Sequence, residues 1–408
     1  MADSAQPGQT LGAATGKGTH NAVLAGFLGW TFDAFDFFVL TFALEHIGRE
    51  FGKTHADMAL TIAATLATRW IGAIVFGLLA DRFGRRIPLI VNILYYSLIE
   101  VLSGLAPNYR VFFFLRLLYG IGMGGEWGVG ASLTMESIPS KWRGLVSGFL
   151  QEGYALGYLL AAVAYGFLYP HWGWRPLFFV GGLPALLTLF VRARVKEPEA
   201  WHRSRTDWPA YRRALFGNWK RFAYLVVLMA MVNFISHGTQ DMYPTYLQHQ
   251  HGFSAERTSY ITAFAMFGAI CGGLAFGYFS DRKGRRRAMV TALLLGCLLI
   301  PMWVFAPSLA LILAGGFLMQ FMVQGAWGVI PAHINELSPD ALRGFFPGLA
   351  YQLGVLIASE SAYVEAVMAR SMSYGRAMGL FALIVLLAGA IVVWLGPEEH
   401  RIEFGRGG

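Results

Sequence analysis

Twelve long apolar segments, separated by short polar breaks, constrain the fold of this chain more than any other feature of its sequence. They lie at approximately 21–44, 59–80, 87–106, 111–135, 144–168 and 174–193, and then at 222–247, 258–279, 288–305, 308–333, 345–368 and 375–395. A helix of about 20 apolar residues is long enough to cross the hydrocarbon core of a membrane. Since a spanning segment must satisfy its own backbone groups, each segment is expected to be a helix. The sequence therefore predicts an all-α membrane protein with twelve transmembrane helices.

The composition and the placement of charge agree with a membrane protein. Only 14% of the residues are charged, whereas a soluble domain has about 25%. The net charge of +8 could suggest nucleic acid, but most of the 32 Lys and Arg fall in alternate loops, on the same side as both termini. Because loops rich in Lys and Arg stay in the cytoplasm, we expect a monomeric, multi-pass inner (plasma) membrane protein in contact with lipid, with both termini cytoplasmic.

The two halves of the chain repeat each other at a spacing of 200 residues. The matching segments are 77–86 with 277–286, 127–128 with 327–328, and 136–144 with 336–344. An even number of spans in each half makes the repeats parallel, as in two bundles related by an axis along the membrane normal. The expected organisation is a disordered cytoplasmic tail at 1–20, an N-terminal six-helix bundle at 21–193, a cytoplasmic linker at 194–221, a C-terminal six-helix bundle at 222–395 and a cytoplasmic tail at 396–408.

The repeated Gly-x-x-x-Asp-Arg-x-Gly-Arg-Arg loop resembles the hallmark loop of major facilitator transporters. The resemblance implies the fold of that family, two pseudo-symmetric six-helix bundles with a substrate site between them. Asp81 and Asp281 oppose the sign that topology favours in these loops, which indicates a mechanical role. The residues predicted to clip helix ends together in one state and release them in another are Asp81, Arg85, Glu136, Arg143, Asp281, Arg285, Glu336 and Arg343.

Ionisable side chains within a spanning segment are costly and are therefore functional candidates. The seventh segment carries a dense set, since Asn233, His237 and Asp241 share one helical face, with Ser236 and Gln240 beside them. Hydrogen bonding between helices is the alternative explanation. Five polar groups exceed what that role needs, so the pattern favours a face that lines a watery passage.

The stretch Asn233–Thr245 resembles the signature of the fungal lactate/pyruvate:proton symporters, which are related to the bacterial sialic acid:proton symporters. Residues 69–73, 151–158 and 351–354 also resemble that branch. The chain shows neither the long hydrophilic tails of the fungal members nor the extra helix pair of many sialate carriers, which favours a small cargo. The resemblance implies proton-coupled symport of a lactate- or pyruvate-like monocarboxylate, driven by the proton gradient.

The candidate binding residues suit an organic anion. Arg69 lies near the centre of the second segment, and its planar guanidinium suits bidentate binding of a carboxylate. A structural ion pair with Asp33 or Asp36 explains Arg69 almost as well. The residues expected to bind the substrate are Arg69, Asn233, Gln240 and Gln352.

The proton acceptor must titrate within the working pH range. Histidine has an ordinary pKa of about 6.5, and an aspartate one turn away would titrate together with it. His237 and Asp241 are therefore the predicted proton-coupling pair. Asp33 and Asp36 are the second choice.

Several other charged residues in the spans have no assigned role. Arg116 resembles an arginine linked to proton coupling in another major facilitator motif, or it pairs with Glu152. Glu126 lies among closely spaced glycines, while Glu360 and Glu365 approach the outer mouth, where water would solvate them.

Alternative functions stay open at the level of the sequence. They are symport of sialic acid or another organic acid, facilitated transport without a proton, drug/proton antiport, and nutrient sensing by a membrane receptor without net transport. The sequence shows no nucleophile–base pair and no cluster of metal ligands, so we expect no enzymatic activity, no metal and no cofactor. Saturable counterflow would separate a carrier from a receptor.

Overall fold

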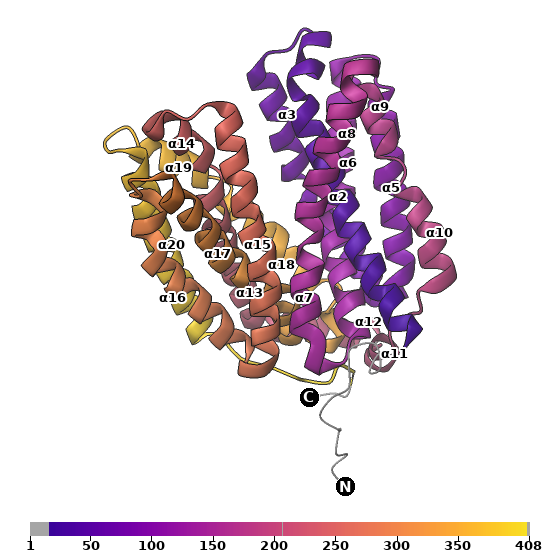
Figure 1. Ribbon diagram of the computed structural model, residues 1–408. Coiled ribbons are helices and arrows are strands. Elements are labelled where there is room, and N and C mark those ends of the chain that lie inside the picture. The colour runs from indigo at the N-terminus through magenta and orange to yellow at the C-terminus, as the bar shows by residue number, and fades with distance from the viewer. Residues whose placement is uncertain (1–15, 206, 406–408) are drawn as a thin grey trace.

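The computed structural model describes residues 16–205 and 207–405, and every regular element in these ranges is a helix (Figure 1). The first half contains α2 (Lys17–Glu50), α3 (His55–Ala67), α4 (Arg69–Phe83), α5 (Arg86–Gly104), α6 (Tyr109–Ser137), η1 (Ser140–Trp142), α7 (Arg143–Gln151), α8 (Gly153–Trp172), α9 (Arg175–Val180) and α10 (Ala185–Arg194). The linker contains α11 (Glu199–Ser204) and α12 (Trp208–Gly217). The second half contains α13 (Trp219–Gln240), α14 (Tyr243–His251), α15 (Ala255–Lys283), α16 (Arg285–Val304), α17 (Leu309–Leu337), η2 (Asp340–Leu342), α18 (Phe346–Ala358), α19 (Ser361–Met368) and α20 (Tyr374–Leu395).

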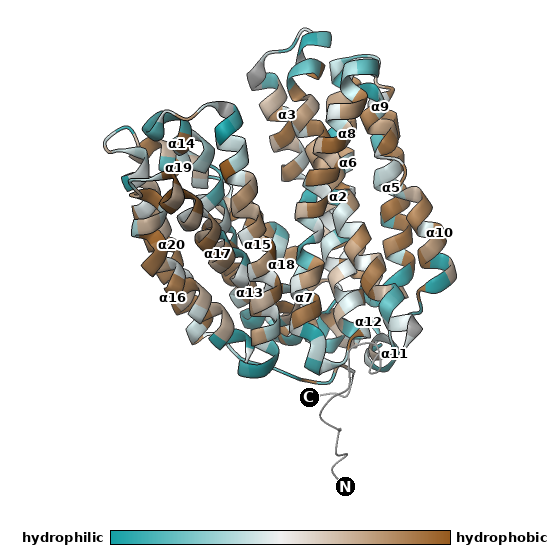
Figure 2. Cartoon of the chain, viewed as in Figure 1, coloured by the Kyte–Doolittle hydropathy of each residue, from teal (hydrophilic) through white to brown (hydrophobic). Residues whose placement is uncertain are grey.

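Nine stretches of the described chain are long and apolar enough to cross a membrane. The other three predicted segments are also helical, but each carries charges or a break. Helix α6 contains Arg116 and Glu126, α7 and α8 meet at Glu152, and α18 is separated from α19 by Ser359 and Glu360. Figure 2 shows apolar residues along the middle of the helices and polar residues at both ends of the molecule, as a membrane protein requires.

The duplication seen in the sequence is repeated in the helices. Helices α6 and α17 are each 29 residues long and begin and end 200 positions apart. Helices α2 to α10 enclose one core of buried apolar side chains, and a second core lies mainly among α13 to α20. The chain thus folds as two similar helical bundles (Figure 1).

The two bundles meet near the end of the molecule that carries the linker helices α11 and α12, which we call the linker side. There α7 packs against α15 and α17, while α18 packs against α4 and α6. Helices α8 and α19, which continue α7 and α18 away from the linker side, pack mainly on their own bundles. The bundles accordingly spread apart at the opposite end (Figure 1).

The segments outside the bundles only partly resemble the predicted tails and linker. Residues 1–15 of the predicted N-terminal tail lie outside the described residues, and α2 begins at Lys17, inside the range predicted as tail. In the linker, Trp201 and Tyr211 are buried, because α11 packs on α6 and η2 and α12 packs on η2, whereas Trp208 is exposed. The segment after α20 also folds back, because Phe404 is buried on the linker side.

Candidate functional site

Arg69 lies at the interface of the two bundles, where α3 ends and α4 begins. Its side chain is buried, with 5% of the residue exposed. The guanidinium carbon lies 5.7 Å from the centre of the Tyr351 ring, which belongs to α18 of the other bundle. The Nε and Nη2 atoms have no hydrogen-bond partner among the residues that the structure describes. The ion pair with Asp33 or Asp36 considered above is not formed in these residues.

Aromatic side chains from both bundles surround the Tyr351 ring. The ring centre of Trp127 lies 4.6 Å away, that of Trp327 5.9 Å and that of Trp30 6.4 Å. Tyr154 stacks on Trp30, with 5.7 Å between the two ring centres. We call these five aromatic residues and Arg69 the central cluster. Trp127 and Trp327, equivalent positions of the two repeats, thus meet on one ring.

The polar side chains of α13 (Asn233, His237 and Gln240) already have hydrogen-bond partners, which limits what they can offer a ligand. His237 and Asp241 form a close pair, with 3.0 Å between Nδ1 and Oδ2, and their side chains are 38% and 40% exposed. Gln240 donates from Nε2 to Oε1 of Gln320 on α17 at 2.9 Å. Asn233 donates one N–H of its side-chain amide to the Met229 carbonyl of its own helix at 2.7 Å, which leaves its second N–H and its side-chain oxygen for a ligand.

Asp241 lies within electrostatic range of the opposite bundle. The charge of Asp241 acts on the hydroxyl of Tyr154, which belongs to the N-terminal bundle. The charge of Arg69 acts on the same hydroxyl. Gln352, the remaining predicted binding residue, donates to the Gly124 carbonyl across the bundle interface at 3.4 Å, and its Oε1 has no partner in the described chain. Arg69 and Gln352 therefore lie at the interface between the bundles, and Asp241 lies within electrostatic range of it.

A second group of buried charges lies inside the N-terminal bundle. Asp33 and Asp36 are fully buried, and their carboxylate oxygens have no hydrogen-bond partner in the described ranges. Arg116 pairs with Glu100 of α5, at 2.6 Å between Nη2 and Oε2. The alternative pairing of Arg116 with Glu152 is therefore wrong, because Glu152 lies at the junction of α7 and α8 and faces α15. Sequence reasoning overlooked Glu100, although a lone glutamate inside an apolar segment is itself a signal.

Two further glutamates are buried. Glu126 packs against Gly29 and Gly130, where the missing side chains of the glycines make room for its carboxylate. Glu365 was expected to be solvated, but it is 1% exposed and its oxygens have no partner in the described residues. The charge of Asp241 acts on Glu365. Burial between α13 and α20 explains the difference, since α19 packs on both helices.

On the linker side, the predicted gating residues of the first repeat form a buried network. Arg85 donates from Nη1 to Oδ1 of Asp81 at 2.7 Å and from Nη2 to Oε1 of Glu136 at 2.8 Å. Asp81 also accepts the backbone N–H groups of Gly344 and Phe345, at 2.6 and 3.1 Å. These two residues lead into α18 of the other bundle, so Asp81 ties the bundles together.

The second repeat builds the same network in the same way. Arg285 donates from Nη1 to Oδ1 of Asp281 at 2.8 Å and from Nε to Oε2 of Glu336 at 2.9 Å. Asp281 accepts the backbone N–H groups of Gly144 and Leu145, at 2.7 and 2.9 Å. These residues begin α7, so Asp281 ties the C-terminal bundle to the N-terminal one.

Two arginines connect the networks across the interface. Arg143 approaches Glu336 with 3.3 Å between Nη1 and Oε1, and Arg343 approaches Glu136 with 3.5 Å between Nη1 and Oε1. All four side chains are buried. The structure therefore brings the eight predicted gating residues together in one closed contact between the bundles.

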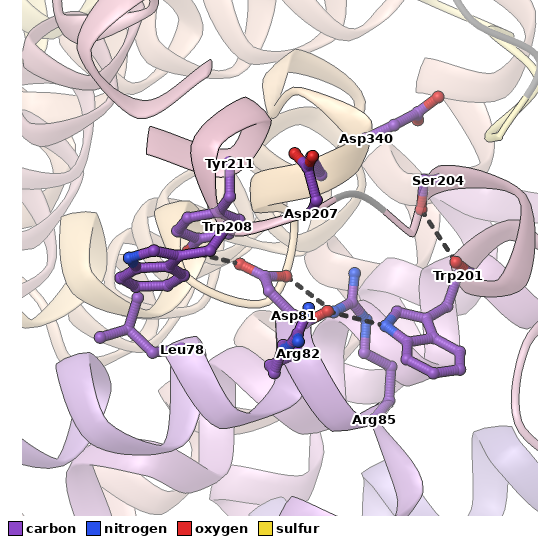
Figure 3. A pocket seen from close by; sticks show the side chains of 11 residues that line it. Leu78, Asp81, Arg82, Arg85, Trp201, Ser204, Asp207, Trp208, Tyr211 and Asp340 are labelled. Carbon is purple, nitrogen blue, oxygen red and sulfur yellow. Dashed lines mark hydrogen bonds and ion pairs between the residues drawn. The ribbon is translucent and has the colours of Figure 1, made fainter. Parts of the chain in front are cut away.

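Among the described residues, the linker adds hydrogen bonds to the first network and none to the second. Tyr211 donates its hydroxyl to Oδ2 of Asp81 at 3.1 Å, and Trp201 donates its indole N–H to the Asp81 carbonyl at 2.9 Å. Figure 3 shows Tyr211 and Trp201 on either side of Asp81, in a small pocket at the end of α4. The linker is thus part of the closed contact and not only a connection between the bundles.

Two pseudo-symmetric helical bundles, with a buried arginine between them and a closed ionic contact at one end, are typical of a membrane carrier. The chain belongs to the Major Facilitator Superfamily, which matches residues 26–351 and again 242–407. It is therefore a multi-pass membrane transporter of this family and not an enzyme, as predicted.

Relatives and a solved structure agree with this assignment. The chain is 29% identical to the carboxylic acid transporter protein homolog of Saccharomyces cerevisiae, over 93% of this chain and 68% of that protein. It is also 29% identical to the sialic acid transporter NanX of Escherichia coli, over 92% of this chain and 93% of that protein. The fold is similar to that of the proton:xylose symporter XylE, with a TM-score of 0.76 and 18% identity over 95% of this chain and 98% of that one. The predicted fold and the wider relationship are confirmed; the lactate/pyruvate assignment stays a prediction.

Proposed function

We propose that this chain is a secondary active transporter that carries a small monocarboxylate together with a proton. The observation that carries the proposal is the state of Arg69, whose guanidinium is buried between the bundles with two nitrogen atoms unpaired in the described chain. A buried charge without a partner is strongly unfavourable. A carboxylate that enters between the bundles would supply that partner and could bind the guanidinium through two hydrogen bonds.

The names of the relatives support an organic acid as the cargo. The yeast relative is named for carboxylic acids and the bacterial one for sialic acid. Both cargoes share a carboxylate, the group that Arg69 suits, so sialic acid or another organic acid is the alternative cargo. Binding to a panel of lactate, pyruvate, benzoate and sialic acid, measured by thermal shift at roughly pH 5.5–7.5, tests this choice across the ordinary titration range of histidine. A protein that no acid stabilises would contradict the proposal.

The proton is assigned to the His237–Asp241 pair, with Asp33 and Asp36 as the second candidates. A monocarboxylate carries one negative charge, so co-transport with one proton is electroneutral and the pH gradient can drive it. Asp241 lies within electrostatic range of the opposite bundle, and the side chains of the pair are 38% and 40% exposed. A proton can therefore reach it from the open end of the molecule, and Asn233, Gln240 and Gln352 would hold the oxygens of the cargo nearby.

The orientation follows from the distribution of charge. The linker side carries the hallmark loops with their arginines and most of the Lys and Arg of the chain, and loops of this kind stay in the cytoplasm. We therefore place the linker side, with both termini, in the cytoplasm of a cell with this protein in its inner (plasma) membrane. The closed linker side then defines an outward-facing carrier, which works as a monomer because the two bundles of one chain build the whole site.

Asp241→Asn is expected to abolish uptake driven by a pH gradient while exchange of the acid across the membrane persists. A gradient of one pH unit supports about tenfold accumulation at one proton per anion, and a carrier without its proton site loses that accumulation. Uptake into vesicles with and without an acidified outside measures the effect. Glu256→Gln removes an exposed carboxylate at the start of α15 and serves as the control. A fully coupled Asp241→Asn protein would refute this assignment and direct the search to Asp33 and Asp36.

A further inference from the structure

Two buried indole N–H groups that share the Tyr351 ring with Arg69 lack a hydrogen-bond partner in the described chain. They belong to Trp30 of α2 and Trp327 of α17, which are 3% and 4% exposed. Both rings meet the Tyr351 ring edge-on, and Arg69 lies over the same ring. Buried donors are rarely left unpaired in folded proteins, so three unsatisfied donor groups around one ring indicate a site for an acceptor.

Trp127 provides an internal comparison. It occupies the position equivalent to Trp327 in the first repeat and lies closer to Tyr351 than either of the other two tryptophans. Its indole N–H, however, is directed to Oε1 of Gln151 at 3.5 Å. Packing on Tyr351 therefore does not in itself leave an indole N–H unpaired.

We propose that Trp30 and Trp327 donate hydrogen bonds to the cargo carboxylate alongside Arg69, an inference that rests on the proposed function. A carboxylate has two oxygens and about four acceptor positions, enough for the guanidinium and both indoles. Because Trp30 and Trp327 come from opposite bundles, the bound anion bridges the bundles directly. The aromatic walls of the central cluster favour a flat, unsaturated carbon body, since aromatic rings stack on flat π systems. Pyruvate is the smallest acid of this class in the panel, and benzoate is a larger one.

Trp30→Phe and Trp327→Phe test the inference because phenylalanine keeps an aromatic ring but removes the N–H. Each is expected to weaken binding of pyruvate and benzoate on the order of tenfold or more, as for other hydrogen bonds to a charged group. Trp303→Phe is the matched control, with an expected change of less than about twofold. It removes another buried indole N–H without a partner in the described chain, but its ring stacks on Tyr243 and not on Tyr351. The measurement is thermal-shift titration of the full chain in detergent with each acid, and the melting temperature without ligand reports whether each variant is folded.

The outcomes separate this inference from the proposed function. If wild type binds the acids, and Arg69→Gln does not, but Trp30→Phe and Trp327→Phe bind as wild type does, the indole donors are refuted and the organic-acid function stands. If wild type binds none of the acids, the function itself fails. Equal binding of lactate and pyruvate would overturn the preference for a flat body.

A second inference comes from an independent observation on the linker side. The ring of Phe404 lies between Arg143 and Arg343, with each guanidinium carbon 3.7 Å from the ring centre. These are the two arginines that cross the interface to Glu336 and Glu136. Cation–π contacts of this kind are stronger when they are desolvated, and Phe404 is 7% exposed.

Hydrogen bonds hold the same segment against both bundles. The Ile402 carbonyl accepts from Nη1 of Arg143 in the N-terminal bundle at 2.9 Å. The Gly405 N–H donates to Oδ2 of Asp340 in the C-terminal bundle at 3.0 Å. These two anchors lie on opposite sides of the interface, so the bundles cannot separate there while the segment stays in place.

We infer that residues 396–405 form a latch that stabilises the closed linker side and must be released before the carrier opens there. Phe404→Ala removes the ring from between the arginines, while the ion pairs to Glu336 and Glu136 keep their partners. The fraction of molecules open on the linker side is then expected to rise on the order of tenfold, from the loss of two cation–π contacts.

Spin labels at Arg82→Cys and Arg282→Cys, exposed and equivalent positions of the two repeats, report the separation of the bundles. Cys271 and Cys297 are replaced by serine in the labelled protein. Pulsed EPR of the full chain should show a larger long-distance population in Phe404→Ala than in the parent. Phe216→Ala, which removes an exposed ring from α12, should leave the distances unchanged. Identical distributions in Phe404→Ala and the parent would overturn the latch, as would an equal shift in Phe216→Ala.

Discussion

Arg69→Gln is expected to lower the affinity for every transported acid by about 100-fold or more. Glutamine keeps hydrogen-bonding capacity but removes the charge, and loss of one partner from a buried charge pair costs about 2–5 kcal/mol. Arg69→Lys should recover part of the binding, because lysine restores the charge without the bidentate geometry. Thermal-shift titration with pyruvate and benzoate, together with uptake of radiolabelled pyruvate, measures both effects.

The control for this experiment is Arg110→Gln, which removes an exposed arginine near the start of α6. It should leave affinity and uptake close to wild type. Wild-type affinity in Arg69→Gln would place the anion site elsewhere, and the proposed roles of Trp30 and Trp327 would fall with it. A folded Arg69→Gln protein that binds no acid is the result expected here.

Glu336→Gln is expected to open the linker side and to stop uptake. The carboxylate of Glu336 is paired with both Arg285 and Arg143, at 2.9 and 3.3 Å, and is fully buried. Removal of one partner from a buried ion pair typically costs about 3–5 kcal/mol, which corresponds to a shift in the equilibrium of about 100-fold or more. This cost falls on the closed state through the Arg143–Glu336 pair, because that pair crosses the interface between the bundles and the Arg285–Glu336 pair lies within one bundle.

The alkylation rate of a cysteine at Ala332, introduced after Cys271 and Cys297 are replaced, measures this opening. Ala332 is buried between the bundles, where its N–H donates to Ser147 of α7. The rate should rise strongly in Glu336→Gln and stay at the parent level in Glu199→Gln, which neutralises an exposed glutamate of the linker. Slow alkylation in Glu336→Gln would show that the ionic network does not hold the linker side closed.

The sequence predicted the features that depend on length and repetition. Apolar segments long enough to span a membrane specified the helices, and the 200-residue register predicted which loops are equivalent. The gating residues could be chosen in advance because each network appears twice. Their assembly into one contact agrees with the choice, while their mechanical role stays a prediction until the linker side has been opened by mutation.

The partners of single charged residues could not be predicted, because a sequence does not state which helix faces which. Arg116 pairs with Glu100 of the neighbouring α5, although Glu152 seemed as suitable by composition. Glu365 is buried because α19 turns it toward α13 and α20 and not toward the open end. The sequence around Trp30 does not distinguish it from a packing residue, although Thr31 and Asp33 follow it closely. Its unpaired N–H became visible only once the position of Tyr351 was known.

The divided helices α7–α8 and α18–α19 have a mechanical consequence. In each pair, the segment on the linker side (α7 or α18) packs against the opposite bundle, and the other segment (α8 or α19) packs mainly on its own bundle. A rocking motion that closes the end opposite the linker side can therefore use the helix breaks at Glu152 and at Ser359–Glu360 as hinges. Neither pair has to bend within a continuous helix. Within one membrane crossing, the contact between the bundles and the movement of the passage thus depend on different helical segments.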